Sequence, residues 1–201
     1  MKGYYFITDK RLSRLGNVSD VKSAVKAGVK IVQYREKEAD TKEMYEEALK
    51  LRKICKNVIF LINDRVDIAL AVNADGVHLG QLDMPYKAVR KLLGKKKIIG
   101  ITVHSLKEAL LAQKLGADYL GVSPIFQTST KPDAKNPVGI GLIKRLRKGI
   151  KIPIVAIGGI NLSNAKEVIS AGANYICAIS AVVSKKNVGF EIGRFQKISG
   201  F

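Results

Sequence analysis

Residues 58–83 read VIFLINDRVDIALAVNADGVHLGQLD, and they contain the unit from which the chain is built. Two short apolar runs, 58–63 and 76–80, each end in a cluster of polar residues. Runs of Val, Ile and Phe bounded by Gly and Asp are typical of parallel strands that are buried on both faces. The polar residues at the ends of these two runs are Asn63, Asp64, Arg65, Gln81 and Asp83.

The same unit recurs along the whole chain. Eight apolar runs of strand length are found at 4–8, 31–36, 58–63, 76–80, 98–102, 118–123, 153–158 and 175–180. Between them lie stretches with apolar residues three and four apart, which is helical spacing. These predict helices over 41–56, 84–93, 105–115, 140–148 and 162–171, and from about 181 onward. Thr41 is a candidate N-cap, and Gly94, Gly116, Gly149 and Gly172 follow their helices as C-terminal signals.

Eight alternations in 201 residues predict a single (β/α)8 barrel, one domain over 1–201. The structural alternative is a doubly wound sheet. That fold needs a nucleotide-binding loop at its switch point, and the chain has neither a G-x-G-x-x-G after its first run nor a Walker loop. No linker or change of composition divides the chain.

Composition sets further limits. Hydrophobic residues make up 47% of the chain, and no apolar run approaches the roughly 20 residues that cross a bilayer. Because the chain enters a strand directly after Met1, Lys2 and Gly3, we expect no secretory signal and a cytoplasmic location. The two cysteines, Cys55 and Cys177, have no metal-binding spacing and are expected to be buried.

The net charge of +18, from 35 Lys and Arg against 17 Asp and Glu, raises the possibility of nucleic-acid binding. The basic residues fall mainly on predicted helix faces, with no interleaved aromatics and no nucleic-acid motif. We therefore expect a solvated basic surface that attracts anionic substrates. No membrane or nucleic-acid partner is predicted.

In a barrel of this kind the active site lies at the carboxyl ends of the strands. Asp64 and Asp83 end consecutive strands, about 4.8 Å apart in a sheet, and two carboxylates with substrate phosphates suit Mg²⁺. The alternatives are that Asp64 caps a helix or pairs with Arg65, and that Asp83 is an N-cap. Arg35 and Lys37 lie two residues apart at the end of the second predicted strand. Because alternate side chains of a strand point the same way, the two cations suit a pyrophosphate; the alternative is a pair of surface cations.

The double glycine Gly158–Gly159, with the backbone after the eighth strand, matches the phosphate site of such barrels. It could also simply permit a tight turn. His78 lies within a strand and His104 just beyond one. For His78 a hydrogen-bonded structural role is expected. His104 could contact the substrate or support its neighbours, and chemistry is assigned to neither.

These residues resemble those of the thiamine-phosphate synthases over essentially the whole chain. The resemblance rests on five blocks in order, QYREK at 33–37, NDRVD at 63–67, GVHLGQLD at 76–83, SPIFQTSTKP at 123–132 and AIGGI at 156–160. The family joins an aminopyrimidine methyl pyrophosphate to a thiazole phosphate and requires Mg²⁺. The resemblance thus implies a transferase acting on small phosphorylated substrates, with dimers as the family's habit.

The resemblance also implies a role for each matching residue. Asp64 and Asp83 would hold Mg²⁺, and Arg35, Lys37 and Lys131 would bind the departing pyrophosphate. The pyrimidine would be held by Gln33, Asn63 and Thr102. The thiazole phosphate would be held by Thr128, Thr130, Gly159, Ile179 and Ser180. No protein nucleophile is expected.

Three positions depart from the family pattern, namely Tyr34, Thr102 and Ser123. Thr102 replaces the usual Ser and adds a methyl group near the pyrimidine. The competing interpretation is a thiazole tautomerase of the same superfamily, which places a catalytic histidine where this chain has Pro124 and lacks the metal carboxylates. A non-catalytic phosphate-binding barrel is the third possibility.

Overall fold

The computed structural model describes residues 2–130 and 135–200, and it forms a closed barrel of eight parallel strands in sequential order. The strands are β1 (Gly3–Ile7), β2 (Ile31–Tyr34), β3 (Ile59–Asn63), β4 (Gly76–Leu79), β5 (Ile98–Val103), β6 (Tyr119–Val122), β7 (Ile154–Ile157) and β8 (Tyr175–Cys177). Pairing of Gly3 and Tyr4 of β1 with Tyr175 and Ile176 of β8 closes the barrel. The predicted (β/α)8 barrel is confirmed.

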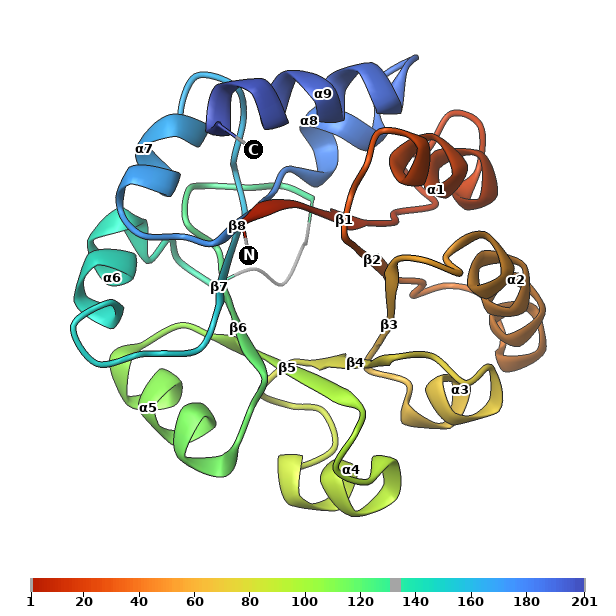
Figure 1. Ribbon diagram of the computed structural model, residues 1–201, viewed down its shortest axis with the longest axis horizontal. Coiled ribbons are helices and arrows are strands. Elements are labelled where there is room, and N and C mark those ends of the chain that lie inside the picture. Colours follow the sequence, from red (N-terminus) through yellow and green to blue (C-terminus); the bar gives the residue numbers. More distant parts are fainter. Residues whose placement is uncertain (1, 131–134, 201) are drawn as a thin grey trace.

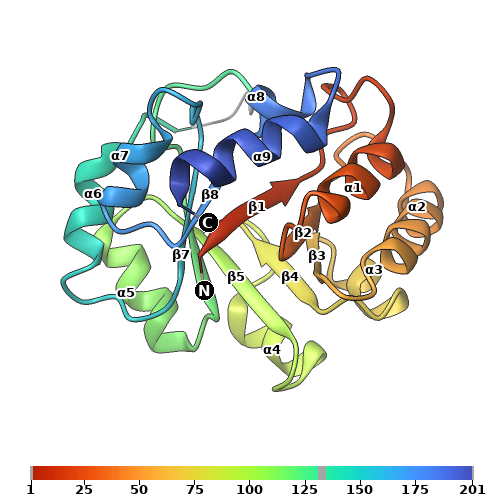
Figure 2. The ribbon, with the colours of Figure 1, turned by 45° about the horizontal axis from the view of Figure 1, so that its top comes forward.

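Helices surround the barrel, as Figures 1 and 2 show. They are α1 (Asn17–Lys26), α2 (Thr41–Ile54), α3 (Val66–Ala71), α4 (Tyr86–Leu93), α5 (Leu106–Leu115), α6 (Gly139–Leu146), α7 (Ala165–Ser170), α8 (Ile179–Val183) and α9 (Val188–Ser199). The last helix, α9, lies between α7 and α1 and completes the outer ring (Figure 1). None of the helices in the described part of the chain has the length and apolarity of a bilayer span.

The strands bury both faces, and this gives two apolar layers. Alternate strand residues such as Phe6, Val32 and Ile62 pack against helix residues, including Leu51 of α2. The other strand residues form a smaller cluster inside the barrel, made of Tyr5, Ile7, Ile31, Leu61, Tyr119, Val155, Tyr175 and Cys177. Three of these inner residues are tyrosines, so the interior also contains polar groups.

Six of the eight strands end earlier than the sequence predicts, whereas β3 ends as predicted and β5 extends one residue further, to Val103. Arg35, Gly80 and Gly158 were expected inside strands, but they lie in the loops that follow β2, β4 and β7. Ile179 and Ser180, expected at the end of the eighth strand, begin α8, and a second helix, α9, follows. Arg35, Asp64 and Asp83 thus lie in loops, whereas Gln33, Asn63 and Thr102 lie in strands.

The helix predictions need several corrections, and helix α7 begins at Ala165, three residues after its predicted start. The N-cap of α2 is Asp40 rather than Thr41, because the Asp40 Oδ1 atom accepts from the Glu43 N–H at 2.8 Å. Helices α1 and α3 were not predicted; α3 has only six residues, too few to show a helical period. Helix α6 ends at Leu146, three residues before Gly149.

We expect Gly76→Ala to disrupt the barrel. A Cβ atom at residue 76 would lie 1.9 Å from the backbone oxygen of Ile98, its pairing partner in β5. Because a backbone atom cannot yield without separating the strands, the loss of folding free energy should reach about 3 kcal/mol or more.

Gly193→Ala in α9 is the matched control, since a Cβ there meets no atom within 4 Å. It should stabilise the protein by about 0.5–1 kcal/mol through helix propensity. Urea unfolding followed by circular dichroism measures both variants. Equal stability of Gly76→Ala and the parent chain would contradict this account of β4 and β5.

Candidate active site

Two carboxylates meet at the carboxyl ends of β3 and β4. Asp64 directly follows β3 and has a left-handed backbone, with φ of 60°. Its N–H donates to the carbonyl of His78 in β4 at 2.8 Å, so the turn is tied to the next strand. A non-glycine residue in this conformation stores strain, which is often found at functional sites.

Asp83 lies beside Asp64, in the loop after β4. Its Oδ2 atom accepts from the Gly80 N–H at 2.6 Å. Burial, together with a hydrogen bond between the Asp83 and Asp64 carboxyl groups, raises the pKa of Asp83 above its ordinary value. Two carboxylates this close repel each other when both are ionised, and a cation placed between them would relieve that repulsion.

The structure excludes the simpler interpretations of these two acids. Arg65 pairs with Asp67, Nη2 to Oδ2 at 2.5 Å, rather than with Asp64. Helix α3 has Arg65 at its N-cap and α4 has Pro85, and neither cap residue makes a side-chain hydrogen bond to its helix. Neither acid is therefore a helix cap.

Lys37 lies next to these two acids. Its Nζ atom lies 2.5 Å from Oδ2 of Asp64, and its side chain is 47% exposed. Arg35 turns the other way, placing Nη1 3.3 Å from Oδ2 of Asp9 after β1. The two side chains were expected to point the same way, as alternate residues of a strand do, but β2 ends at Tyr34, before both. Arg35 instead pairs with an acid in the loop after β1, and Lys37 with one in the loop after β3.

Asp9 was missed in the sequence analysis, although it directly follows the first apolar run, which ends at Thr8, as other rim residues follow theirs. Its side chain is 1% exposed, and the Thr8 hydroxyl bonds both the N–H and the carbonyl of Arg35, at 2.9 and 3.1 Å. Arg11 is a further missed residue, which donates to the carbonyl of Thr130 at 3.1 Å. The loops after β1, β2 and β6 are thereby joined.

The remaining polar residues of the rim come from β2, β3 and β5. Gln33 is buried and donates from Nε2 to the Tyr5 hydroxyl at 2.8 Å. Asn63 is the last residue of β3 and is 9% exposed. The Thr102 hydroxyl lies 2.8 Å from Nε2 of His78.

The loops after β6 and β7 pack closely together. Gly158 and Gly159 have φ of 98° and 64°, and a Cβ on Gly159 would lie 2.5 Å from the Gln127 carbonyl oxygen. The Thr128 hydroxyl accepts from the Thr130 N–H at 3.3 Å. The double glycine is therefore required both by its conformation and by the loop it touches. Lys131 lies outside the described residues.

Both histidines are hydrogen-bonded, as a supporting role predicts. Nδ1 of His104 lies 2.5 Å from the Ser123 carbonyl oxygen, joining β5's loop to β6's. His78 contacts Tyr119 and Thr102 through its two ring nitrogens, each at 2.8 Å. The described residues contain no group of three His, Cys, Asp or Glu side chains that could hold a metal ion, so neither histidine belongs to one.

The family model described as thiamine monophosphate synthase matches residues 4–182. The chain belongs to that family. It is 54% identical over 193 residues to the thiamine-phosphate synthase of Methanosarcina barkeri, covering 96% of this chain and 88% of the relative. It is 51% identical over 187 residues to the synthase of Chloroflexus aurantiacus, covering 92% and 86%.

A solved structure agrees with these relatives. The thiamine phosphate pyrophosphorylase from Pyrococcus furiosus superposes with a TM-score of 0.90 at 41% identity, covering 98% of this chain and 95% of that one. As a member of the thiamine monophosphate synthase family, the chain is an enzyme of thiamine biosynthesis, a transferase. The recognition made from the five sequence blocks is confirmed.

The raised pKa of Asp83 predicts how Asp83→Asn changes stability. The folded protein holds the Asp83 proton more tightly than the unfolded chain does, so ionisation of this group opposes folding. Its contribution to stability falls as pH rises from the ordinary carboxyl pKa of 3.8 through the raised value. In metal-free buffer at pH 7, Asp83→Asn should be more stable than the parent chain by about 0.2–1 kcal/mol, and the gain should vanish in acid.

Asp67→Asn is the control with the opposite sign. The hydrogen bond from Arg65 lowers the pKa of Asp67, so this carboxylate stabilises the fold at neutral pH and loses that effect as pH falls. Urea titrations at several pH values measure both variants. A less stable Asp83→Asn at pH 7 would show that the two acids do not repel each other.

Proposed function

We propose that this rim joins 4-amino-2-methyl-5-pyrimidinylmethyl diphosphate to thiazole phosphate, releasing pyrophosphate and forming thiamine phosphate. The observation that carries the proposal is the proximity of Asp64 and Asp83, which together with burial raises the pKa of Asp83, with the Lys37 ammonium group 2.5 Å from Asp64. Acids that repel each other, next to a half-exposed ammonium group, suit a divalent cation and the phosphate groups that bring it.

Mg²⁺ fits these residues. Asp64 and Asp83 supply two carboxylates from adjacent loops, and Mg²⁺ commonly takes one or two carboxylates and completes its shell with water and substrate phosphate. When bound, the ion would neutralise negative charge on the diphosphate of the substrate. Lys37 would then exchange its partner, Asp64, for a phosphate oxygen.

In the reaction, the bond between the pyrimidine methylene carbon and the diphosphate oxygen breaks, and its electron pair leaves with pyrophosphate. Arg35, Lys37 and Lys131 would stabilise the charge that grows on this leaving group. The methylene carbon becomes cationic, and the thiazole nitrogen donates its lone pair to form the new carbon–nitrogen bond. No protein nucleophile takes part, and alignment of the two substrates supplies much of the rate.

Two groups of residues would hold the two substrates. Gln33, Asn63 and Thr102, on adjacent or nearby strands, would hold the pyrimidine. The thiazole phosphate would be held by Thr128, Thr130, Gly159, Ile179 and Ser180. In support of the second group, the packing of Gly159 against Gln127 brings the loops after β6 and β7 together, and Ile179 and Ser180 open α8 after β8.

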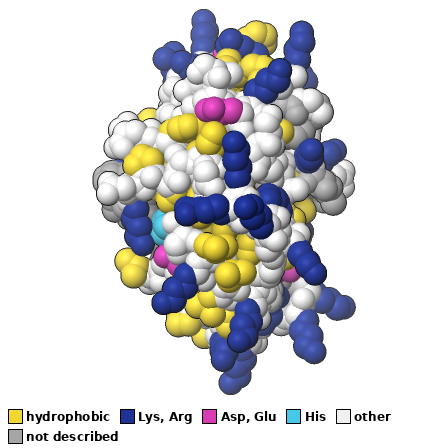
Figure 3. Space-filling model, turned by 90° about the vertical axis from the view of Figure 1, so that its left-hand side faces the viewer, with side chains coloured by type: hydrophobic (Ala, Val, Ile, Leu, Met, Phe, Trp, Pro, Cys, Tyr) yellow, Lys and Arg dark blue, Asp and Glu magenta, His cyan; other side chains and the backbone are white. Residues whose placement is uncertain are grey.

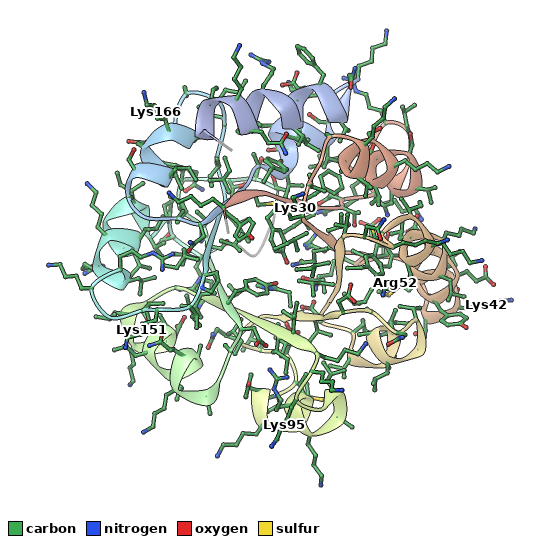
Figure 4. The ribbon with its side chains drawn as sticks, in the orientation of Figure 1. Lys30, Lys42, Arg52, Lys95, Lys151 and Lys166 are labelled. Carbon is green, nitrogen blue, oxygen red and sulfur yellow. The ribbon has the colours of Figure 1, made fainter. Side chains whose placement is uncertain are left out.

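The distribution of charge supports small anionic substrates rather than nucleic acid. Lys and Arg side chains stand apart over the face in Figure 3, with uncharged surface between them. The labelled Lys42, Lys95, Lys151 and Lys166 lie on the outer ring of the molecule in Figure 4. We further propose a cytoplasmic enzyme without nucleic-acid or membrane partners, assembled as a homodimer.

The test is pyrophosphate release by the purified protein given both substrates and Mg²⁺. Thiamine phosphate should appear in equal amount, and omission of the thiazole phosphate or addition of EDTA should stop its formation. Isomerisation of the thiazole without pyrophosphate release would instead indicate a tautomerase. Absence of both reactions would leave a binding protein.

Lys37→Met should lower kcat/KM for the pyrimidine diphosphate by about 100-fold, since one charged contact to a leaving group is worth that much. Its stability should change little because the side chain is half exposed. Lys42→Met is the matched control, because Lys42 points outward from α2 (Figure 4). Equal activity of the two variants would remove Lys37 from the site.

Mg²⁺ binding to the free enzyme has a readout that does not depend on activity. A ligand present at a free concentration of ten times its Kd adds about 1.4 kcal/mol to the free energy of unfolding. For a chain of this size, that raises the Tm by about 3–6 °C. We expect this shift in the parent protein and in Asp67→Asn, and its loss in Asp83→Asn. An equal shift in all three would place the metal elsewhere.

A further inference from the structure

A row of hydrogen-bonded side chains crosses the interior of the barrel from β2 to β5. Gln33 donates from Nε2 to the Tyr5 hydroxyl at 2.8 Å, and the Tyr5 and Tyr119 hydroxyls lie 2.7 Å apart. The Tyr119 hydroxyl lies 2.8 Å from Nδ1 of His78, whose Nε2 lies 2.8 Å from the Thr102 hydroxyl. We call this row the tyrosine–histidine relay; it joins five strands.

The relay is buried, and the barrel is shaped around it. Tyr5 is fully buried, Tyr119 is 6% exposed and His78 is 5% exposed. A Cβ atom on Gly100 would lie 2.0 Å from Cζ of Tyr119, and one on Gly121 would lie 2.9 Å from Cε1 of His78. Neither glycine has a positive φ, so these two positions are kept small by the rings rather than by backbone conformation.

With Gln33 donating to Tyr5, one direction of donation gives every hydroxyl hydrogen between Tyr5 and His78 an acceptor. Burial raises the pKa of both Tyr5 and Tyr119, so each keeps its hydroxyl hydrogen. The Tyr5 oxygen accepts from Gln33, and its own hydrogen is directed to Tyr119. Tyr119 in turn donates to Nδ1 of His78, because a buried hydroxyl hydrogen without an acceptor is costly.

This direction fixes both ends of the relay. His78 must carry its hydrogen on Nε2, where it donates to the Thr102 oxygen. The Thr102 hydroxyl hydrogen is then left for another acceptor, and Thr102 is only partly buried at the rim. At the other end, the Gln33 amide is oriented by its contact with Tyr5, which leaves its carbonyl oxygen to accept.

We propose that Tyr5, Tyr119 and His78 are positioning residues that orient Gln33 as an acceptor and Thr102 as a donor for the heteroaromatic ring of the substrate. The inference rests on the proposed function, in which Gln33 and Thr102 hold the pyrimidine. An aminopyrimidine presents a donor on its amino group and acceptors on its ring nitrogens. A rim with one fixed acceptor and one fixed donor selects that pattern.

The first experiment reads the direction of the relay in the parent protein. The chain has two histidines, His78 and His104. Nitrogen NMR of histidine-labelled protein therefore gives signals from two imidazole rings, and the signals lost in His104→Asn are assigned to His104. We expect His78 in its Nε2–H form at pH 7.5. A hydrogen on Nδ1 instead, or on both nitrogens, would overturn the proposal without affecting the proposed reaction.

The second experiment breaks the relay. Tyr119→Phe should raise KM for the pyrimidine diphosphate about 10-fold, leave KM for the thiazole phosphate within twofold, and alter the His78 nitrogen shifts. Tyr5→Phe breaks the neighbouring link, should raise the same KM, and replaces Tyr119→Phe if that variant does not fold. A structural role alone would not separate the two KM values.

Tyr34→Phe is the matched control. This variant also removes a hydroxyl from a buried tyrosine. In the parent protein, however, the Tyr34 hydroxyl donates to Oε2 of Glu47 in α2, at 2.8 Å, and is not part of the relay. Both KM values should stay within twofold of the parent. Equal effects of Tyr119→Phe and Tyr34→Phe would overturn the proposal. An unchanged pyrimidine KM in Gln33→Ala would overturn the assignment of Gln33, and with it the premise of this inference.

Discussion

Closure of the parallel barrel is the constraint on which the rest of the molecule depends. Each strand hydrogen-bonds to both neighbours, and pairing of β1 with β8 leaves no free edge. Since all eight strands run the same way, every carboxyl end opens on one rim. Residues as distant in sequence as Arg11 and Thr130 therefore come into contact.

The rim concentrates charges that neutralise one another only in part. Asp9 has Arg35 and Arg11 as partners. Asp64 and Asp83 lie close to each other, and among the described residues the ammonium group of Lys37 pairs with Asp64. The left-handed backbone of Asp64 adds strain at the same point. Under the proposed function, a bound cation and the substrate phosphates would relieve this strain and repulsion, and function commonly has such a cost in stability.

The interior of the barrel contributes more than apolar filling. Leu61, Val155 and other apolar residues share it with Tyr5 and Tyr119, whose hydroxyls need partners once they are buried. Those partners lie in a row that ends at two residues of the rim. Core packing and the orientation of rim side chains are thus coupled in the same layer.

Local sequence patterns were enough to predict the alternation of strands and helices, and hence the barrel and the rim that carries Asp64 and Asp83. These follow from local patterns: apolar runs of strand length, helical spacing between them, and polar residues at each run's end. The five motif blocks also identified the family. Short elements such as α3, and the cap at Asp40 next to the equally plausible Thr41, were missed or misplaced because few residues carry the signal.

The pairing of the rim residues, in contrast, depends on contacts between loops that are far apart in the sequence. Arg35 and Lys37 are two residues apart, yet one turns to Asp9 and the other to Asp64, because β2 ends before both and each meets a different neighbouring loop. The contact of Tyr5 with Tyr119 is set by closure, which brings β1 and β6 together across the interior. No local pattern encodes these pairings, since they depend on how the eight strands close around a common axis.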